Sequence, residues 1–214
     1  MSWTVAMDQG QLNDVRSLLA NIPKGYNRAV MRAANYAADR TKTAVSKKLK
    51  ALITADPYYI DKSLRKVRAV IADPEARLVV NPAGDSIPLF RFDVSFMFPT
   101  VSGGVTANIF KDGVQPLHLR HAFVAKMRSG HVGVFERSGP KVKMGGGSNY
   151  AGQYKQPIKE AFGPHPARVF ERTPGVEKEL LDIAADRFAS ELMRQAELLY
   201  KQEFGTDPPE DWAN

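Results

Sequence analysis

The chain is 214 residues long, carries a formal net charge of +7 and contains no cysteine. That length supports a hydrophobic core of ordinary size, and we expect one domain with extensions. The absence of cysteine excludes disulfides, thiolate metal ligands and cysteine nucleophiles, and it suits a protein made in a reducing cytoplasm. No apolar run approaches the roughly 18 residues of a membrane helix, and the N-terminus lacks the pattern of a signal peptide. We therefore expect a soluble protein without a membrane partner.

The charges are distributed unevenly along the chain. Between Lys24 and Val70 twelve basic residues accompany three acidic ones, whereas from Gly175 to the C-terminus ten acidic residues accompany four basic ones. Net charge informs about partners rather than about the fold. Two segments of opposite charge are consistent with ion pairing between neighbouring subunits. They are also consistent with a basic face of the protein that contacts nucleic acid. Two solvated helix faces are the alternative explanation.

Apolar residues in the N-terminal part recur at helical intervals. From about residue 27 to 53 they are spaced by three and four, with basic residues between them, which predicts a long amphipathic helix. Its apolar face is narrow and rich in alanine, so it suits close packing against another helix or a sheet. A short helix over about 11–20 is expected to precede it.

Proline and aspartate mark the next helix boundaries. Asp56 precedes Pro57, and because aspartate caps helices and proline is tolerated in the first turn, we expect a short helix over about 57–64. A second long helix is predicted after Pro174, ending near Phe204, with a flexible tail beyond it.

Alternating apolar and polar residues replace the helical spacing from Lys66 onward. They predict four strands, at 66–72, 76–80, 90–98 and 105–110. The clearest hairpin joins 121–127 to 131–136 through a turn at Arg128, Ser129 and Gly130. The glycine-rich stretch 138–157 is expected to be a mobile loop that orders against a partner.

This order of elements predicts an α+β fold, an antiparallel β-sheet packed with a long N-terminal and a long C-terminal helix. The predicted division has four parts. They are an N-terminal arm with a short helix (1–24), a core α+β domain (25–174), a C-terminal helix (175–204) and a flexible tail (205–214).

No group of residues has the pattern of an active site. The glycines at 145–147 lack the lysine and the strand-to-helix setting of a phosphate loop. His118 and His121 are three residues apart, but the second begins a predicted strand, where that spacing does not give a shared face. The strand region is poor in carboxylates and has no nucleophile elbow. We predict that the protein is not an enzyme and uses no cofactor or metal.

Basic residues of the first long helix and of the following strand form the candidate site. Such residues neutralise phosphates without reading base sequence. No aromatic ladder and no recognition-helix or zinc-finger signature accompanies them. A solvated helix face is the alternative. The candidates for DNA or partner contact are Arg28, Arg32, Arg40, Lys47, Lys48, Lys50, Arg65, Lys66 and Arg68.

Several segments together resemble the prophage minor tail protein Z family, the tail-completion proteins of lambda-like long-tailed phages. The segments are NRAVMRAANYAADRTKTAVSKKLKALI, ADPEARLVVNPAGDSIPLFRF, HAFVAKMRSGHVGVFER and PIKEAFGPHPARVF with the helix that follows it. They cover most of the chain from Asn27 to Leu199. Each is a spacing of apolar, glycine and proline residues without a catalytic signature.

The resemblance implies a structural component of the virion at the head-proximal end of the tail, assembled in the host cytoplasm. It implies a role in tail completion, in head-to-tail joining and in positioning the packaged DNA. The implied partners are the tail terminator, the tail tube and the head-to-tail connector, with this chain forming a homo-oligomeric ring through heterologous interfaces. The residues themselves leave open a non-specific basic nucleic-acid-binding protein and, less favoured, an enzyme.

Overall fold

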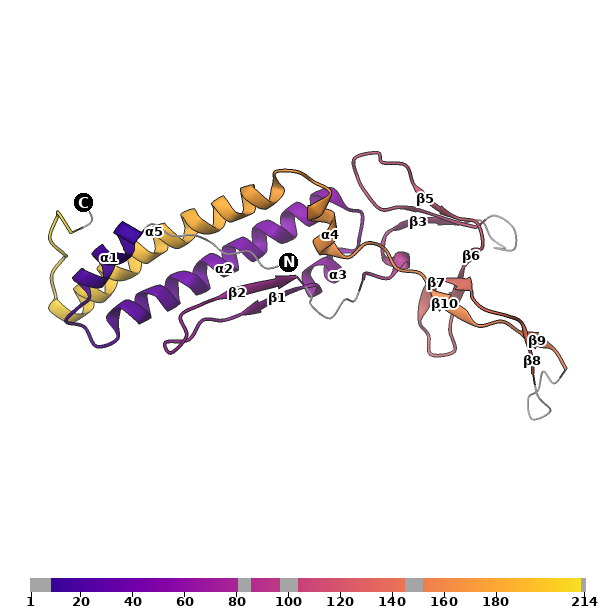
Figure 1. Ribbon diagram of the computed structural model, residues 1–214, viewed down its shortest axis with the longest axis horizontal. Coiled ribbons are helices and arrows are strands. Elements are labelled where there is room, and N and C mark those ends of the chain that lie inside the picture. The colour runs from indigo at the N-terminus through magenta and orange to yellow at the C-terminus, as the bar shows by residue number, and fades with distance from the viewer. Residues whose placement is uncertain (1–8, 81–85, 97–103, 145–151, 213–214) are drawn as a thin grey trace. The chain divides into compact units, whose positions relative to one another are not determined.

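The computed structural model describes residues 9–80, 86–96, 104–144 and 152–212. Helices and antiparallel sheets both occur, which confirms the predicted α+β class (Figure 1). Contacts divide the chain into two compact units. The helical unit comprises Met1–Lys48, Lys62–Ala83 and Ala167–Asn214, and the sheet unit comprises Leu49–Asp61 and Gly84–Pro166. Each unit is thus assembled from separate stretches of chain, whereas the division predicted from the sequence is contiguous.

Three helices and a hairpin build the helical unit. The helices are α1 (Gln9–Leu18), most of α2 (Gly25–Leu52) and α5 (Val176–Phe204), with the short α4 (Pro166–Glu171) before the last. The hairpin pairs β1 (Leu64–Val67) with β2 (Arg77–Val80). The predicted long helices at 27–53 and after Pro174 are therefore confirmed to within about two residues.

Small side chains on α2 pack with large side chains on α5. The buried face of α2 repeats alanine every four residues, the interval that brings side chains onto one helix face. The buried face of α5 carries phenylalanine and leucine at similar spacing, and one apolar cluster contains both sets. Its members include Ala29, Ala33, Ala37, Phe188, Leu192, Ala196 and Leu199. The alanine-rich face predicted for close packing does contact a second helix.

The side chain of Asn35 on α2 holds the chain that follows β1. Its Nδ2 donates to the Ala69 carbonyl oxygen at 3.0 Å, and its Oδ1 accepts from the Ala69 N–H at 3.1 Å. Lys66 on β1 also forms an ion pair with Asp39 on α2. The predicted strand 66–72 is therefore wrong in its second half, because Asn35 takes both main-chain groups of Ala69 and leaves none for a ladder.

Two three-stranded antiparallel sheets form most of the sheet unit. One has the order β3 (Asp93–Phe96), β4 (Val105–Asn108), β5 (Leu117–Leu119). The other has the order β10 (Ile158–Glu160), β7 (Val132–Arg137), β6 (Ala122–Lys126), and it contains the predicted hairpin. The sequence did not predict β5 or β10, which are only three residues long.

The segment after α2 is hydrogen-bonded into this unit. Thr54 N–H donates to the Ile109 carbonyl at 3.0 Å, and Lys111 N–H donates to the Leu52 carbonyl at 3.0 Å. The fully buried Ile53 lies between these bonds. The short α3 (Pro57–Lys62) follows, and Asp56 caps it as predicted, with Oδ1 accepting from the Tyr58 N–H at 2.9 Å.

Two further expectations need correction. The predicted strand 90–98 begins instead with a 3-10 turn, η1 (Leu89–Arg91), because Pro88 starts it and Phe92 N–H donates back to Leu89. Within the stretch expected to be a loop, β8 (Val142–Lys143) pairs with β9 (Tyr154–Lys155). The glycines at 145–147 and residues 97–98 lie outside the described residues.

The C-terminal segment contacts the helical unit rather than hanging free. Gly205 ends α5 in the left-handed conformation at φ +72°, and its N–H donates to the Lys201 carbonyl. Lys201 Nζ then lies 2.8 Å from Asp207 Oδ1. Trp212 packs partly buried against the apolar cluster of the helical unit. The part of the predicted flexible tail up to Trp212 is thus attached to the unit.

Truncating a leucine of the buried face of α5 tests the packing of α2 with α5. We expect Leu192→Ala to lower the free energy of unfolding by about 2–5 kcal/mol, because it leaves a cavity in the apolar cluster. Leu198→Ala on the same helix is the control, since Leu198 is 43% exposed. Urea unfolding followed by circular dichroism measures both, and equal losses would contradict the packing described here.

Adding a methyl group at Gly104 tests the sheet unit. A Cβ there would lie 2.5 Å from the Leu119 carbonyl oxygen, whereas at Gly113 it would meet nothing within 4 Å. Both glycines have positive φ, so alanine costs about 1–2 kcal/mol at either position. We expect Gly104→Ala to lower the free energy of unfolding by about 1–3 kcal/mol more than Gly113→Ala does, from the clash. Denaturant titration of the two variants compares them.

Candidate nucleic-acid and partner interface

Three of the basic residues predicted for DNA or partner contact, Lys48, Lys50 and Lys66, form ion pairs within the chain. Lys48 Nζ on α2 lies 2.6 Å from Glu179 Oε2 on α5. Lys50 Nζ lies 2.8 Å from Asp61 Oδ2. Exposed pairs of this kind contribute little stability, about 0–1 kcal/mol. Their effect on function is larger, because an ammonium that already has a carboxylate partner attracts phosphate less strongly.

The ion pair between Lys48 and Glu179 also bears on the uneven distribution of charge along the sequence. The basic segment contains Lys48 and the acidic segment contains Glu179, and the two helices that carry them pack in one chain. Charges that we expected to pair between subunits therefore pair within the chain at this point. The hypothesis of pairing between subunits is correspondingly weakened.

Arg32 and Arg40 on α2 are engaged as well. Arg32 Nη1 donates to Gln195 Oε1 on α5 at 3.2 Å. The guanidinium carbon of Arg40 lies 5.0 Å from the centre of the Tyr36 ring, a cation–π distance. With Lys66, which is paired to Asp39, these residues serve the packing of the helical unit.

The other predicted candidates do not gather at one place. Arg28 and Lys47 lie near opposite ends of α2, about 28 Å apart at 1.5 Å per residue. Arg65 and Arg68 lie on and just after β1, and both are exposed. Among the described residues none of these four has an ion-pair partner. They form a dispersed positive surface rather than a built site.

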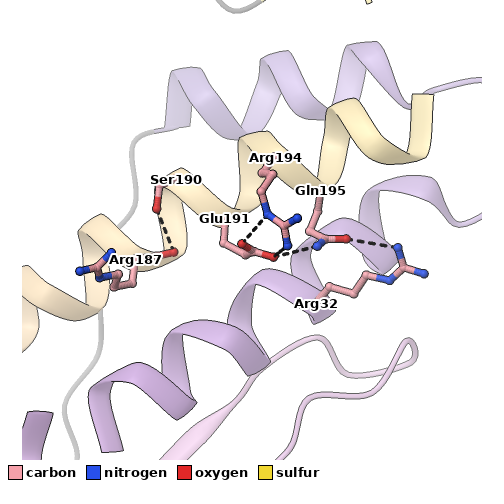
Figure 2. Close-up of polar contacts among 6 residues, drawn as sticks. All are labelled: Arg32, Arg187, Ser190, Glu191, Arg194 and Gln195. Carbon is pink, nitrogen blue, oxygen red and sulfur yellow. Dashed lines mark hydrogen bonds and ion pairs between the residues drawn. The ribbon is translucent and has the colours of Figure 1, made fainter. Parts of the chain in front are cut away.

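A polar network around the buried Glu191 of α5 was not predicted from the sequence (Figure 2). The side chain of Glu191 is only 7% exposed. Arg194 binds it with two bonds, from Nη2 to Oε1 at 2.6 Å and from Nε to Oε2 at 2.9 Å. Gln195 Nε2 donates to Glu191 Oε1 at 2.7 Å, and its own Oε1 accepts from Arg32. The network thus links α5 to α2.

Arg194 determines the ionisation of Glu191. Its hydrogen bonds lower the pKa of Glu191 below the ordinary value, and this effect outweighs the opposing effect of burial. Glu191 in turn raises the pKa of Arg194. A carboxylate held ionised by a two-bond arginine partner is suited to fixing helix packing, and it is poorly suited to acid or base catalysis near neutral pH.

The strongest positive feature that the sequence analysis missed lies beside the glycine loop. Residues 138–159 contain four lysines and no aspartate or glutamate. The lysines are Lys141, Lys143, Lys155 and Lys159, and all are exposed. Two of them lie on β8 and β9. The sequence already shows that this segment has lysines and no acidic residues, but we expected a mobile loop here and did not predict a basic surface.

Two of the histidines form side-chain contacts within the sheet unit. His118 Nδ1 lies 2.9 Å from Thr106 Oγ1 on the neighbouring strand, and His131 Nε2 lies 2.8 Å from Glu160 Oε1. Within the described ranges, no three histidine or carboxylate side chains come together as metal ligands. No helix in the described part of the chain is long and apolar enough to span a membrane.

Comparison of the chain with protein-family models, with curated proteins and with solved structures finds no match in any of the three.

The lowered pKa of Glu191 predicts how the network responds to pH. A carboxylate with a lowered pKa in the folded state stabilises the fold above its unfolded pKa and loses that effect as the pH falls. We expect Glu191→Gln to lower the free energy of unfolding by about 1–2 kcal/mol near pH 7. The difference from the parent protein should shrink as the pH falls below about 4.

Glu179→Gln is the control for this prediction. It removes a carboxylate of the same helix that is 51% exposed and paired with Lys48. We expect a loss below about 0.5 kcal/mol. Denaturant titrations at several pH values measure both variants. A destabilisation by Glu191→Gln that is the same at pH 7 and pH 3 would contradict the ionised network.

Proposed function

We propose that the protein is a structural component of a long-tailed bacteriophage virion, a minor tail or tail-completion protein at the head-proximal end of the tail. In this role it completes the tail, supports head-to-tail joining and helps to position the packaged DNA. Its partners are the tail terminator, the tail tube and the head-to-tail connector, and it acts as a homo-oligomeric ring in the virion rather than as an enzyme.

The observation that carries the proposal is an open strand edge with apolar side chains. β5 is the edge of the sheet β3–β4–β5, and among the described strands it pairs only with β4. Leu117 on this strand is 39% exposed, and Val114 just before it is 49% exposed. Unpaired main-chain groups on an edge strand are a template for another chain. An edge of this kind suits a subunit that joins its neighbours through a sheet.

The resemblance to the protein Z family supplies the identity of the assembly. Three of its four motifs correspond to α2, to the hairpin of β6 and β7, and to the segment from β10 to α4. The fourth, residues 72–92, includes β2 and η1 and extends over residues 81–85, which lie outside the described residues. The first three contribute buried side chains, among them Ala33, Val134 and Val169, so part of the resemblance concerns residues that build the fold.

A non-specific nucleic-acid-binding protein is the second candidate. The exposed Lys47, Arg65 and Arg68, which have no ion-pair partner among the described residues, favour it. Such a protein binds duplex DNA as a monomer, with an affinity that falls steeply as salt is added.

The solution mass of the purified protein distinguishes the two candidates. We expect light scattering to show a ring-sized assembly, either of the protein alone or after addition of the tail terminator of the same phage. A monomer that ignores the terminator but binds DNA would replace the proposal with the second candidate.

A charge on the open strand edge sharpens this test. We expect Leu117→Lys to abolish or strongly weaken the assembly, because a lysine ammonium at an edge strand opposes pairing with another chain. Val70→Lys is the matched control, since Val70 is 54% exposed and lies in the helical unit. Assembly by Leu117→Lys at the level of the control would exclude the β5 edge as the interface.

A further inference from the structure

β8 and β9 form a two-stranded ribbon that continues from β7 and β10. The Arg137–Ile158 pair ends the ladder of β7 with β10, and Ser138 N–H donates to the Pro157 carbonyl at 2.7 Å. Beyond it, Val142 pairs with Lys155 and Lys143 with Tyr154. Figure 1 shows the ribbon leading away from β7 and β10. Main-chain hydrogen bonds therefore hold it as a defined arm.

Packing within the chain does not account for the types of side chain that this ribbon carries. All four of its paired residues are exposed, with Val142 at 48% and Tyr154 at 66%. A two-stranded hairpin without a buried face is only marginally stable by itself. Its side chains therefore face solvent or something outside the chain.

The ribbon and its base carry four exposed lysines, and of these only Lys159 has a carboxylate residue, Glu136, opposite it in a strand ladder. Lys141, Lys143, Lys155 and Lys159 have no ion-pair partner among the described residues. Lys48, Lys50 and Lys66 of the α2 region all have carboxylate partners. Ammonium groups without a carboxylate partner can bind the charged groups of an anionic polymer, and this binding releases the counterions condensed on the polymer.

The register places lysines on both faces of the ribbon. Side chains alternate along a strand, so the pair Lys143–Tyr154 lies on one face with Lys141, and the pair Val142–Lys155 lies on the other. Neither face has the apolar centre around which protein interfaces are built. The major groove of duplex DNA accepts a two-stranded ribbon and has phosphates along both walls.

We infer that the β8–β9 ribbon is a DNA-binding arm that enters a groove of duplex DNA, with its lysines contacting the phosphates on either side. The contacts read the backbone and not the base sequence, and the Tyr154 hydroxyl adds a further group for a phosphate oxygen. The choice of duplex DNA rests on the proposed function, because packaged DNA is the anionic polymer that a neck protein meets. In this arrangement the β8–β9 ribbon contacts DNA, in place of the basic residues of α2.

Replacing the four ribbon lysines tests the inference. The variant K141Q/K143Q/K155Q/K159Q is compared with K47Q/K62Q/R65Q/R68Q, which removes the same number of exposed positive charges from the α2 and β1 region. Fluorescence anisotropy with a short labelled DNA duplex gives the affinity over a range of salt concentrations. Circular dichroism and denaturant titration check that each variant folds.

We expect the ribbon variant to bind DNA about tenfold or more weakly, and the magnitude of the log–log salt slope to fall by about 3.6 when four phosphate contacts are lost. The control variant should stay within about threefold of the parent. If both variants lose the same DNA affinity, the loss comes from the lower net charge alone, and this result would overturn the inference. The pairs K141Q/K143Q and K155Q/K159Q each remove half of the charge, and they provide the same comparison if the fourfold variant does not fold.

Two further measurements separate this inference from its alternatives. Labelled polyglutamate replaces DNA in the same assay, and a ribbon variant that loses polyglutamate binding but keeps DNA binding would identify an acidic protein as the occupant. Light scattering with the tail terminator should give the same assembly for the ribbon variant as for the parent. If the parent assembles but the ribbon variant binds DNA normally, only the ribbon inference fails. If the parent does not assemble, the proposed function fails whatever the ribbon binds.

Discussion

The packing of small side chains on α2 with large ones on α5 is the constraint on which the helical unit depends. Alanine recurs at every fourth position on the buried face of α2 and shares one apolar cluster with Phe188 and Leu192 of α5, so each helix buries its apolar face in a core that contains the other. The β1–β2 hairpin depends on the same helix, because Asn35 on α2 holds Ala69 beyond β1. The polar network of Glu191 joins the two helices again at their buried face.

The same packing changes the meaning of the charge pattern. From the sequence, we expected the basic N-terminal segment and the acidic C-terminal segment to contact other subunits or nucleic acid. Once α2 and α5 pack in one chain, Lys48 neutralises Glu179 and Arg32 binds Gln195. The positive charge left for other molecules is the part that lies far from acidic residues. Lys141, Lys143 and Lys155 meet that condition best, because residues 138–159 contain no carboxylate and only Lys159 lies opposite one, Glu136, on the neighbouring strand.

The sequence predicted those elements whose signals are local and repeated. Both long helices, the Asp56 cap and the central hairpin follow from periodicity and turn chemistry, and the structure confirms them. It did not predict where β1 ends, since Asn35 lies 34 residues away from Ala69. It also missed the short β5, β8, β9 and β10, which strand pairing stabilises rather than residue preference. Of the candidate site, composition located the basic residues, but the partners of Arg32, Lys48 and Lys66 lie 27 or more residues away in the sequence.

The division of the chain into units has a consequence for protein synthesis. The sheet unit uses residues up to Pro166, whereas the helical unit needs α5 near the C-terminus. A ribosome therefore releases every strand of the sheet unit before α2 meets its partner helix. During that interval the alanine face of α2 lacks its partner helix, and its closure awaits the synthesis of α5. Domains fold as their residues emerge, so the sheet unit is available for folding first and the helical unit is completed last.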